Sequence, residues 1–252
     1  MADLTGHVAL ITGGNSGIGL GFASGLARAG ADVAIWGTNP DKNAAAGEQL
    51  AALGGRVHVE RCDVRDEAQI IASFAATVDA LGKVDSVFAN AGVSGSGASL
   101  MDMSLAEWHR VMAVNLDGAF LTLREGARHM VARGEGGAMV AVSSVSAIHG
   151  APNGANYAAS KTALLGLVRA MAVGLARYGI RVNSVLPGWT ETDLTAAGMR
   201  NPKFLNATVS RTPVRRWAVP SEFEKVAVFL ADPELSFHTG ETMVVDGGYS
   251  IF

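Results

Sequence analysis

The chain has few of the features that mark secreted, membrane-embedded or nucleic-acid-binding proteins. Cys62 is its only cysteine, so an intrachain disulfide is excluded and a reducing compartment, the cytoplasm, is expected. No stretch reaches the roughly 18 unbroken apolar residues of a membrane span. The amino terminus lacks the basic and apolar succession of a secretory signal. A formal net charge of -3 gives no electrostatic reason to expect nucleic acid or an anionic membrane as a partner.

Internal repeats, low-complexity tracts and proline-rich linkers are also missing, so no domain boundary is indicated. Residues 1–252 are expected to form a single domain, since one α/β domain of this length is ordinary. Apolar residues make up 49% of the chain, as a sheet covered on both faces requires.

Short apolar strands alternate with helical patterns, and this order predicts a parallel α/β sheet built from right-handed crossovers. About seven strands are expected, with helices on both faces of a doubly wound sheet. The predicted strands are residues 7–12, 32–36, 56–61, 86–89, 138–142, 181–186 and 242–245. The predicted helices are residues 18–29, 41–53, 67–81, 105–133, 157–178 and 222–231. Capping-box spacing marks two helix starts, at Ser104 with Glu107 and at Ser221 with Glu224.

A glycine-rich turn follows the first predicted strand. The apolar run Val8–Ile11 leads into Thr12-Gly13-Gly14-Asn15-Ser16-Gly17-Ile18-Gly19 and then into a helical pattern. Glycine lets the backbone turn tightly and approach a pyrophosphate, which the free N–H groups of a helix amino terminus would attract. No Gly-Lys-Ser/Thr follows, and the spacing differs from Gly-x-Gly-x-x-Gly. For this segment alone, a plain glycine-rich connection is the alternative.

Two further strand ends carry small polar residues, Ser143-Ser144 after residues 138–142 and Asn90-Ala91-Gly92 after residues 86–89. Open α/β sheets bind ligands at the carboxyl ends of strands, so the three ends should converge on one crevice. Tyr157 and Lys161 follow, four apart and thus on one face of a helix. An ammonium beside a phenol favours the phenolate, which makes the pair a candidate acid/base device. Taken alone, the pair is more often a half-buried Tyr followed by a surface Lys.

Together these motifs resemble those of the short-chain dehydrogenase/reductase family. The matching elements, in the family's order and spacing, are Thr12-Gly13-x-x-x-Gly17-x-Gly19, Asn90-Ala91-Gly92, Asn115, Ser144, Tyr157-x-x-x-Lys161, Pro187-Gly188 and Val245-Asp246-Gly247-Gly248. The resemblance implies a Rossmann-like fold and an oxidoreductase that transfers a hydride between a nicotinamide cofactor and a small-molecule alcohol or carbonyl substrate. A dinucleotide-sensing, non-catalytic module is the alternative, although a sensor would not need Tyr157 and Lys161.

The catalytic residues that the resemblance implies are Asn115, Ser144, Tyr157 and Lys161. Tyr157 would be the acid/base, with Lys161 and the positive nicotinamide ring of the oxidised cofactor lowering a phenol pKa that is ordinarily near 10. Lys161 would also bond the nicotinamide ribose. Ser144 would stabilise negative charge that develops on the substrate oxygen. Asn115 would hold a water that links Lys161 to solvent; without the resemblance, an exposed helical asparagine is the better interpretation.

The resemblance also implies the cofactor contacts. The glycines of the first turn would cradle the pyrophosphate, Asn90 would order the crevice beside the adenosine ribose, and Thr192 would meet the carboxamide. Asp63 would accept from the adenine amino group, with helix capping as a competing role. The expected cofactor-binding residues are Gly13, Asn15, Ser16, Gly17, Ile18, Gly19, Thr38, Asp63, Val64, Asn90, Ala91, Gly92, Tyr157, Lys161, Pro187, Gly188, Thr190 and Thr192.

The choice between NAD and NADP rests on the residues after the second predicted strand. Gly37 stands where NAD enzymes of the family usually have Asp, and Thr38 where NADP enzymes often have Arg. Ser16 replaces a basic residue common in NADP enzymes. A 2′-phosphate without a cation is poorly compensated, so the sequence leans weakly towards NAD, although Lys42 could still serve a phosphate.

The substrate pocket is expected to contain Ser94, Ser144, His149, Tyr157 and Trp189. No metal is expected, because the histidines lack ligand spacing. The resemblance implies that the longest connection, residues 189–216, closes over the substrate. Its basic residues suggest an acidic substrate or, alternatively, a solvated face or subunit contact. They are Arg200, Lys203, Arg211, Arg215 and Arg216. The helical patterns 113–131 and 164–175 are apolar over more than one stripe, and with the resemblance they predict a homotetramer.

Overall fold

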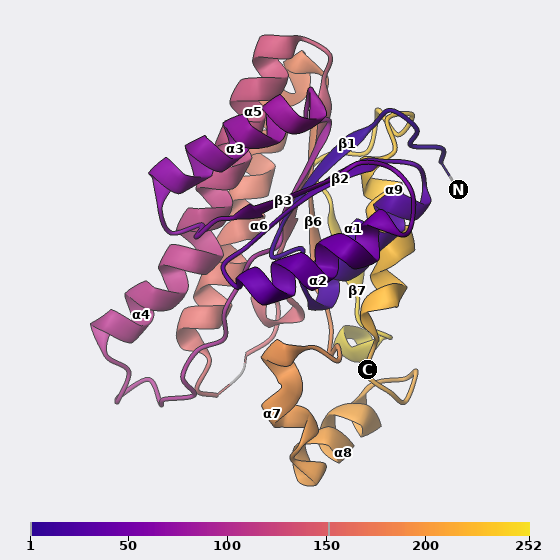
Figure 1. The fold of residues 1–252 in the computed structure, drawn as a ribbon. Helices are drawn as coiled ribbons and strands as arrows, with labels where there is room; N and C mark the ends of the chain where they lie inside the picture. Colours follow the sequence, from indigo (N-terminus) through magenta and orange to yellow (C-terminus); the bar gives the residue numbers. More distant parts are fainter. Residues whose placement is uncertain (1, 151) are drawn as a thin grey trace.

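Seven parallel strands form one sheet in the computed structural model, which describes residues 2–150 and 152–252 (Figure 1). The strand order is β3-β2-β1-β4-β5-β6-β7, and every neighbouring pair is parallel. The strands are β1 (Val8–Thr12), β2 (Asp32–Gly37), β3 (Val57–Arg61), β4 (Ser86–Ala89), β5 (Gly137–Val142), β6 (Ile180–Pro187) and β7 (Thr242–Val245). The predicted fold class is confirmed, and no strand end differs from its prediction by more than one residue.

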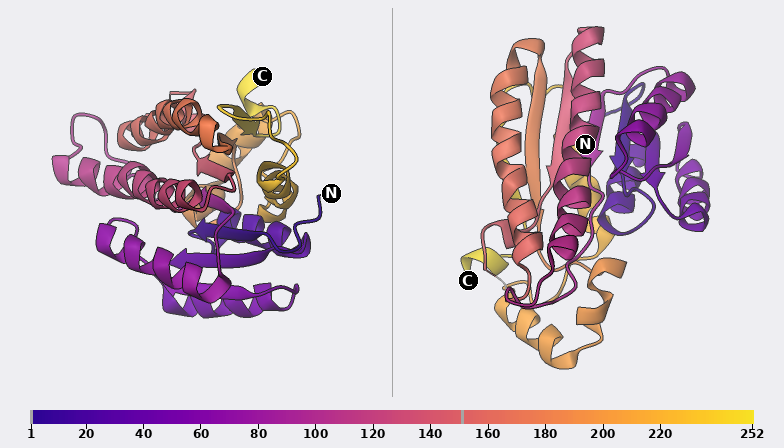
Figure 2. Two further views of the ribbon diagram at one scale, coloured as in Figure 1. Left: turned by 90° about the horizontal axis from the view of Figure 1, so that it is seen from above. Right: turned by 90° about the vertical axis from the view of Figure 1, so that its left-hand side faces the viewer.

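Helices cover both faces of the sheet (Figure 2). One face packs against α1 (Gly17–Arg28), α2 (Pro40–Ala51) and α9 (Glu224–Ala231), and the other against α3 (Glu67–Leu81), α5 (Gly118–Arg133) and α6 (Ala155–Leu175). Alternate residues of β1 enter the two cores, Val8 and Leu10 on one side and Ala9 and Ile11 on the other. A strand buried on both faces is therefore continuously apolar, as its sequence is.

The pattern predicted as one helix over residues 105–133 is interrupted. It consists of α4 (Leu105–Met112), a π-helical segment (Ala113–Asp117) and α5. The prediction of a single regular helix is wrong here, because one extra residue is accommodated without breaking the apolar face. Single π turns of this kind occur often at functional sites, and this one carries Asn115.

Helix α6 and the short turn that follows it are long and apolar enough to span a membrane by length and composition alone. The mean hydropathy of an 18-residue window within residues 155–178 is 1.3. One face, with Leu164, Val168 and Ala172, is buried in the core, and Arg169 is exposed. Core packing explains the apolar residues of that face, which make up about a third of the window.

The segment predicted as an unbroken connection over residues 189–216 contains a 3₁₀ turn (Asp193–Thr195), α7 (Ala196–Met199) and α8 (Pro202–Arg211). These helices lie below the sheet in Figure 1. The start of α8 was readable: Asn201 caps it by accepting from the Phe204 N–H at 3.2 Å, and Pro202 occupies the first helical position. The two ends of this segment are joined by two hydrogen bonds of 2.9 Å, from Ala218 N to Trp189 O and from Glu191 N to Ala218 O.

One of the two predicted helix starts is confirmed. Ser104 Oγ accepts from Glu107 N at 3.1 Å and caps α4. Ser221 is not a cap, because the chain turns earlier, in a 3₁₀ turn over Pro220–Phe223 that precedes α9. There Glu222 accepts from Val219 N at 2.9 Å, so the carboxylate that satisfies the helix start lies two residues before the one predicted.

Candidate active site

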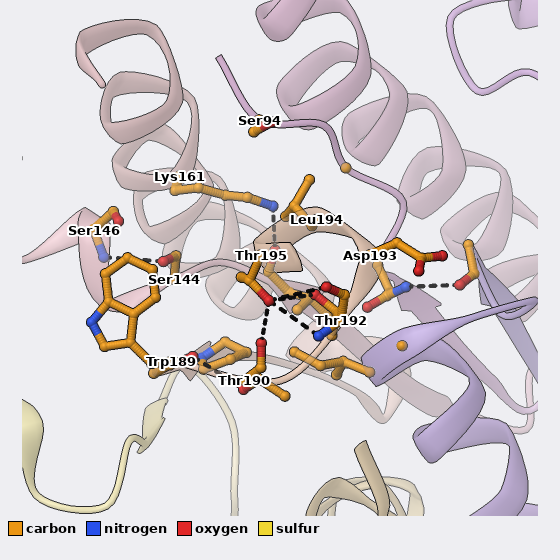
Figure 3. Close-up of a pocket in the computed structure, with 18 of the residues that line it drawn as sticks. Ser94, Ser144, Ser146, Lys161, Trp189, Thr190, Thr192, Asp193, Leu194 and Thr195 are labelled. Atoms are coloured by element: carbon orange, nitrogen blue, oxygen red, sulfur yellow. Dashed lines mark hydrogen bonds between the residues drawn. The ribbon is translucent and has the colours of Figure 1, made fainter. Parts of the chain in front are cut away.

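The strand order reverses between β1 and β4, where an open α/β sheet leaves a crevice at its carboxyl edge. A cavity of about 440 Å³ lies at this point, lined by the turns after β1, β4, β5 and β6 (Figure 3). Most of the predicted site residues line it: Gly13, Ser16, Gly17, Ile18, Gly19, Asn90, Ala91, Gly92, Ser94, Ser144, Tyr157, Lys161, Pro187, Gly188, Trp189, Thr190 and Thr192. Asn15, Thr38, Asp63, Val64, Asn115 and His149 do not.

The glycine-rich turn forms a cradle at the amino terminus of α1. Gly13 and Gly17 have φ of +64° and +53°, a region that side chains disfavour. A Cβ on Gly19 would lie 2.3 Å from the Gly13 carbonyl oxygen, so only glycine fits. Ser16 makes no side-chain cap, which leaves the first N–H groups of α1 for a ligand. These features fit a pyrophosphate group.

Asn90 joins the ends of β1 and β4. Its side-chain amide donates to the Thr12 carbonyl at 2.9 Å and the Gly13 carbonyl at 3.2 Å. In return, Thr12 Oγ1 accepts from the N–H groups of Asn90 at 3.0 Å and Ala91 at 3.1 Å. The two turns that face the crevice are therefore held in a fixed relation.

Tyr157 and Lys161 lie one turn apart on α6, as predicted from their spacing. The ammonium nitrogen of Lys161 is 5.7 Å from the centre of the Tyr157 ring and donates to the Val142 carbonyl at 2.8 Å. Only 4% of Lys161 is exposed, and burial lowers its pKa to about 8.

Burial raises the pKa of Tyr157, while a hydrogen bond with Ser144 acts in the opposite direction. The expected lowering of the phenol pKa by Lys161 and the oxidised nicotinamide ring applies to the cofactor-bound protein and stays a prediction; in the cofactor-free chain burial has the larger effect. The physical reason is that Lys161 is directed at the Val142 carbonyl and its own charged form is disfavoured by burial.

Two serines follow β5, and one of them bonds to α6. Ser144 Oγ accepts from Ser146 N at 3.1 Å and caps the short turn Val145–Ala147. Ser143 Oγ donates to the Lys161 carbonyl at 2.7 Å. The strand end and α6 are thereby fixed together, which sets the position of Ser144 relative to Tyr157.

Asn115 is fully buried behind Lys161. Its side chain accepts from Val93 N at 2.8 Å and donates to Val93 O at 3.0 Å and Ser160 Oγ at 3.2 Å. A Cβ on Gly92 would lie 3.4 Å from both Asn115 Oδ1 and Lys161 Nζ. The alternative of an exposed helical asparagine is wrong, because the amide clamps the chain after β4 to α6.

At the end of β2, the space beside Gly37 is filled. A Cβ there would lie 2.2 Å from Asn15 Nδ2 and 2.5 Å from Asn43 Oδ1, two atoms that are themselves 2.6 Å apart. This pair explains why no acidic side chain stands at the end of β2. Thr38 is exposed, and nearby Lys42 forms an ion pair of 2.6 Å with Asp193.

Asp63 makes a bidentate ion pair with Arg65, and its closest contact is 2.5 Å. The competing role as a helix cap is wrong, since Asp66 caps α3 by accepting from the Ala68 and Gln69 N–H groups. Val64 is buried against Gly118, on the far side of the turn.

The segment after β6 crosses the pocket on the side away from α6, and Thr195 holds it together (Figure 3). Thr195 Oγ1 donates to the Thr190 carbonyl at 2.5 Å and accepts from Thr192 N at 3.1 Å. A Cβ on Gly17 would lie 3.1 Å from Thr192 Cγ2, so this segment rests on the glycine-rich turn.

Sequence reasoning missed several lining residues in that segment, namely Asp193, Leu194, Thr195, Gly198 and Phe204. The missed signal is the Asn201-Pro202 helix start, which predicts a helix in this connection. A helix there makes it possible for Phe204 to face the pocket. His149 was expected in the wall but packs edge-on against Tyr249, with ring centres 6.0 Å apart. Across residues 2–150 and 152–252, no group of three metal-ligating side chains gathers.

Comparison with known proteins agrees with this geometry. A family model described as enoyl-(acyl carrier protein) reductase matches residues 13–250. Short-chain dehydrogenase reductase 5 of Arabidopsis thaliana is 38% identical over 98% of this chain and 96% of its own. The 2,5-dichloro-2,5-cyclohexadiene-1,4-diol dehydrogenase of Sphingobium indicum is 35% identical over 99% of both chains.

Among solved structures, a gluconate 5-dehydrogenase from Burkholderia cenocepacia in complex with NADP and tartrate superposes with a TM-score of 0.93. The two chains are 37% identical, and the match covers 99% of this chain and 97% of the solved one. Two further solved neighbours also contain NADP. The chain therefore belongs to the short-chain dehydrogenase/reductase family and is an oxidoreductase that uses a nicotinamide cofactor.

Proposed function

We propose that Tyr157 is the proton donor and acceptor in hydride transfer between the cofactor and an alcohol or ketone. The observation that carries this proposal is that Ser144, Tyr157 and Lys161 line the same pocket, with the Lys161 ammonium 5.7 Å from the centre of the Tyr157 ring. A substrate oxygen placed between the two hydroxyls would receive a proton from one and a hydrogen bond from the other.

The bound nicotinamide ring would supply or accept the hydride, and the residues of this chain would position it. The cradle of Gly13, Gly17 and Gly19 would hold the pyrophosphate, and Lys161 would turn towards the ribose. Because burial raises the Tyr157 pKa, the resting side chain is a phenol, ready to protonate a carbonyl that is being reduced. Alcohol oxidation needs the phenolate, so its rate should rise with pH.

Substitution of Tyr157 by Phe tests this role, because it keeps the ring and deletes only the hydroxyl. Turnover of a panel of alcohols and ketones should fall by about 10²- to 10⁴-fold, while cofactor affinity, measured by fluorescence titration, stays unchanged. Tyr178→Phe is the matched control, since Tyr178 is exposed at the end of α6. Near-normal turnover by Tyr157→Phe would place the acid/base group elsewhere.

For the cofactor, we propose that NADP is accepted as well as NAD. The weak lean towards NAD rested on the missing cation, yet the filled space beside Gly37 also leaves no carboxylate to repel a 2′-phosphate. Lys42 lies on the first turn of α2 and could leave Asp193 for the phosphate. The NADP found in solved relatives favours this cofactor.

We further propose a homotetramer in the cytoplasm, without membrane or nucleic-acid partners. Support for the assembly comes from two separate exposed apolar regions. The exposed side chains of the first would be Phe120 on α5 and Val173 on α6, and those of the second Phe229 on α9, Phe237 before β7 and Val244 on β7. Two different self-complementary faces generate two twofold axes and hence a tetramer. A compartment that keeps Cys62 reduced fits a chain with one buried free thiol.

A further inference from the structure

The part of the pocket beyond Ser144 and Tyr157 is walled by aromatic rings. Trp189 stacks on Trp217 with ring centres 5.2 Å apart and planes 20° apart, and Phe204 meets Trp189 edge-on at 5.0 Å. Trp217 is 2% exposed and donates to Thr208 Oγ1 at 2.8 Å, so the support behind Trp189 is rigid. Trp189, Phe204 and Leu194 all line the pocket.

Charge is scarce on this wall. Lys161 and Asp193 are the only charged side chains that line the cavity in the described part of the chain, and Asp193 is already paired with Lys42. None of the five basic residues between Arg200 and Arg216 lines it. Arg216 is bound to Glu222 by contacts of 2.6 and 2.7 Å, and Arg211 lies over the Tyr249 ring. A carboxylate substrate would therefore meet no lining cation other than Lys161, whose expected partner is the nicotinamide ribose.

We propose that the substrate is an uncharged secondary alcohol or ketone whose reacting carbon belongs to, or adjoins, a hydrocarbon ring. The ring would lie against Trp189 and Phe204, and its oxygen would reach Ser144 and Tyr157. Flat aromatic walls bury a ring with little loss of side-chain freedom, because Trp189 is already held in place by Trp217. This inference rests on the proposed function, since it names the substrate class of the same site.

The test compares kcat/KM for cyclohexanol and 1-indanol with kcat/KM for 2-butanol and gluconate, using either cofactor. The ring alcohols should exceed gluconate by at least about tenfold, and Trp189→Ala should lower kcat/KM for the ring alcohols about tenfold while changing that for 2-butanol less. Phe204→Ala should act in the same direction; Phe204 is 37% exposed, so the variant is expected to fold.

Trp189→Phe is the conservative variant. The Trp189 indole N–H has no hydrogen-bond partner among the described residues, so Phe keeps a ring in the wall without breaking a bond seen in the structure. It should retain most activity on ring alcohols. Ile71→Ala, at an exposed position on α3, is the control and should change nothing.

Preference for gluconate, or equal loss on every substrate in Trp189→Ala, overturns the substrate class and leaves the oxidoreductase assignment standing. A loss in Trp189→Phe as large as in Trp189→Ala also overturns it, because a ring would then not be what the substrate needs. Failure of the proposed catalytic role is separate: it would be seen as turnover that survives Tyr157→Phe.

Discussion

The ammonium of Lys161 donates to the carbonyl oxygen of Val142 at 2.8 Å, and this hydrogen bond joins α6 to the end of β5. Burying this cation lowers the free energy of unfolding. Burial lowers the Lys161 pKa from 10.5 to about 8, and a single carbonyl contact does not replace the water that the ammonium loses.

The lowered pKa makes stability depend on pH in a defined direction. Below pH 8 the folded and unfolded chains both carry the Lys161 proton, so the full cost of the buried charge is present. Between pH 8 and 10.5 the unfolded chain binds more protons, and the free energy of unfolding rises with pH. Above 10.5 the cost is gone. The difference between the two pKa values corresponds to about 3 kcal/mol.

Lys161→Met should therefore gain stability relative to wild type at pH 7, and most of that gain should disappear by pH 10. The lost hydrogen bond to Val142 adds an offset that does not vary with pH, so the change between the two pH values is the quantity to measure. Urea unfolding of both cofactor-free proteins at pH 7 and 10 provides it. An equal difference at the two pH values would show that Lys161 is not a buried cation in the folded state.

The second prediction concerns the close approach at Gly19. An added Cβ would lie 2.3 Å from the Gly13 carbonyl oxygen and 2.4 Å from Asn90 Nδ2, so Gly19→Ala must displace the turn that faces the crevice. Cofactor affinity should fall at least about tenfold, and the protein should lose about 1–3 kcal/mol of stability. Isothermal titration and urea unfolding measure the two effects.

Gly166→Ala is the matched control for Gly19. Gly166 lies within α6, and a Cβ there would meet no atom within 4 Å. The substitution should stabilise the helix by up to about 1 kcal/mol and leave cofactor affinity unchanged. Equal behaviour of the two variants would mean that the cradle tolerates a side chain.

Most of the fold could be predicted because its strands are buried on both faces. Continuous apolar runs such as Val8–Ile11, bounded by glycine or polar turns, leave little choice of period or length. The π segment at Asn115 could not be predicted in this way, because an extra residue inside an apolar helical pattern changes neither composition nor capping.

The site residues likewise fall into those that the sequence pattern predicts and those that it does not. Residues on strand ends, such as Asn90 and Ser144, reach the pocket because the sheet brings strand ends together. His149 lies on an irregular segment and Phe204 on the short helix α8. The directions of both side chains follow from tertiary packing on Tyr249 and Trp217 rather than from local sequence. The ion pair between Lys42 and Asp193 also could not be predicted, because the two residues are 151 positions apart in the sequence.

The third prediction addresses cofactor choice. Thr38→Arg adds a cation at the exposed end of β2 and should raise the ratio of kcat/KM for NADP to that for NAD by about tenfold or more. Lys42→Ala should lower the same ratio, whereas Asp193→Ala should raise it by freeing Lys42. If Thr38→Arg leaves the ratio unchanged, Thr38 does not lie beside the ribose 2′ position.

The last prediction concerns assembly. Val173 on α6 is 84% exposed, and α5 and α6 run side by side in the right-hand view of Figure 2. Phe237, which precedes β7, is completely exposed at the other region, and β7 itself is an edge strand whose outer side has no neighbouring strand. Exposed aliphatic and aromatic side chains of this size favour burial against another subunit.

A charge introduced into either region should disrupt one interface and spare the other. Val173→Asp and Phe237→Asp should each convert a tetramer to a dimer, because an unpaired buried carboxylate is strongly disfavoured, and the double variant should be monomeric. Multi-angle light scattering at micromolar concentration reads the mass directly, with Ile71→Asp on exposed α3 as the control. A monomeric wild type would refute the tetramer. A single substitution that yields monomers would show that the two regions do not act as independent interfaces.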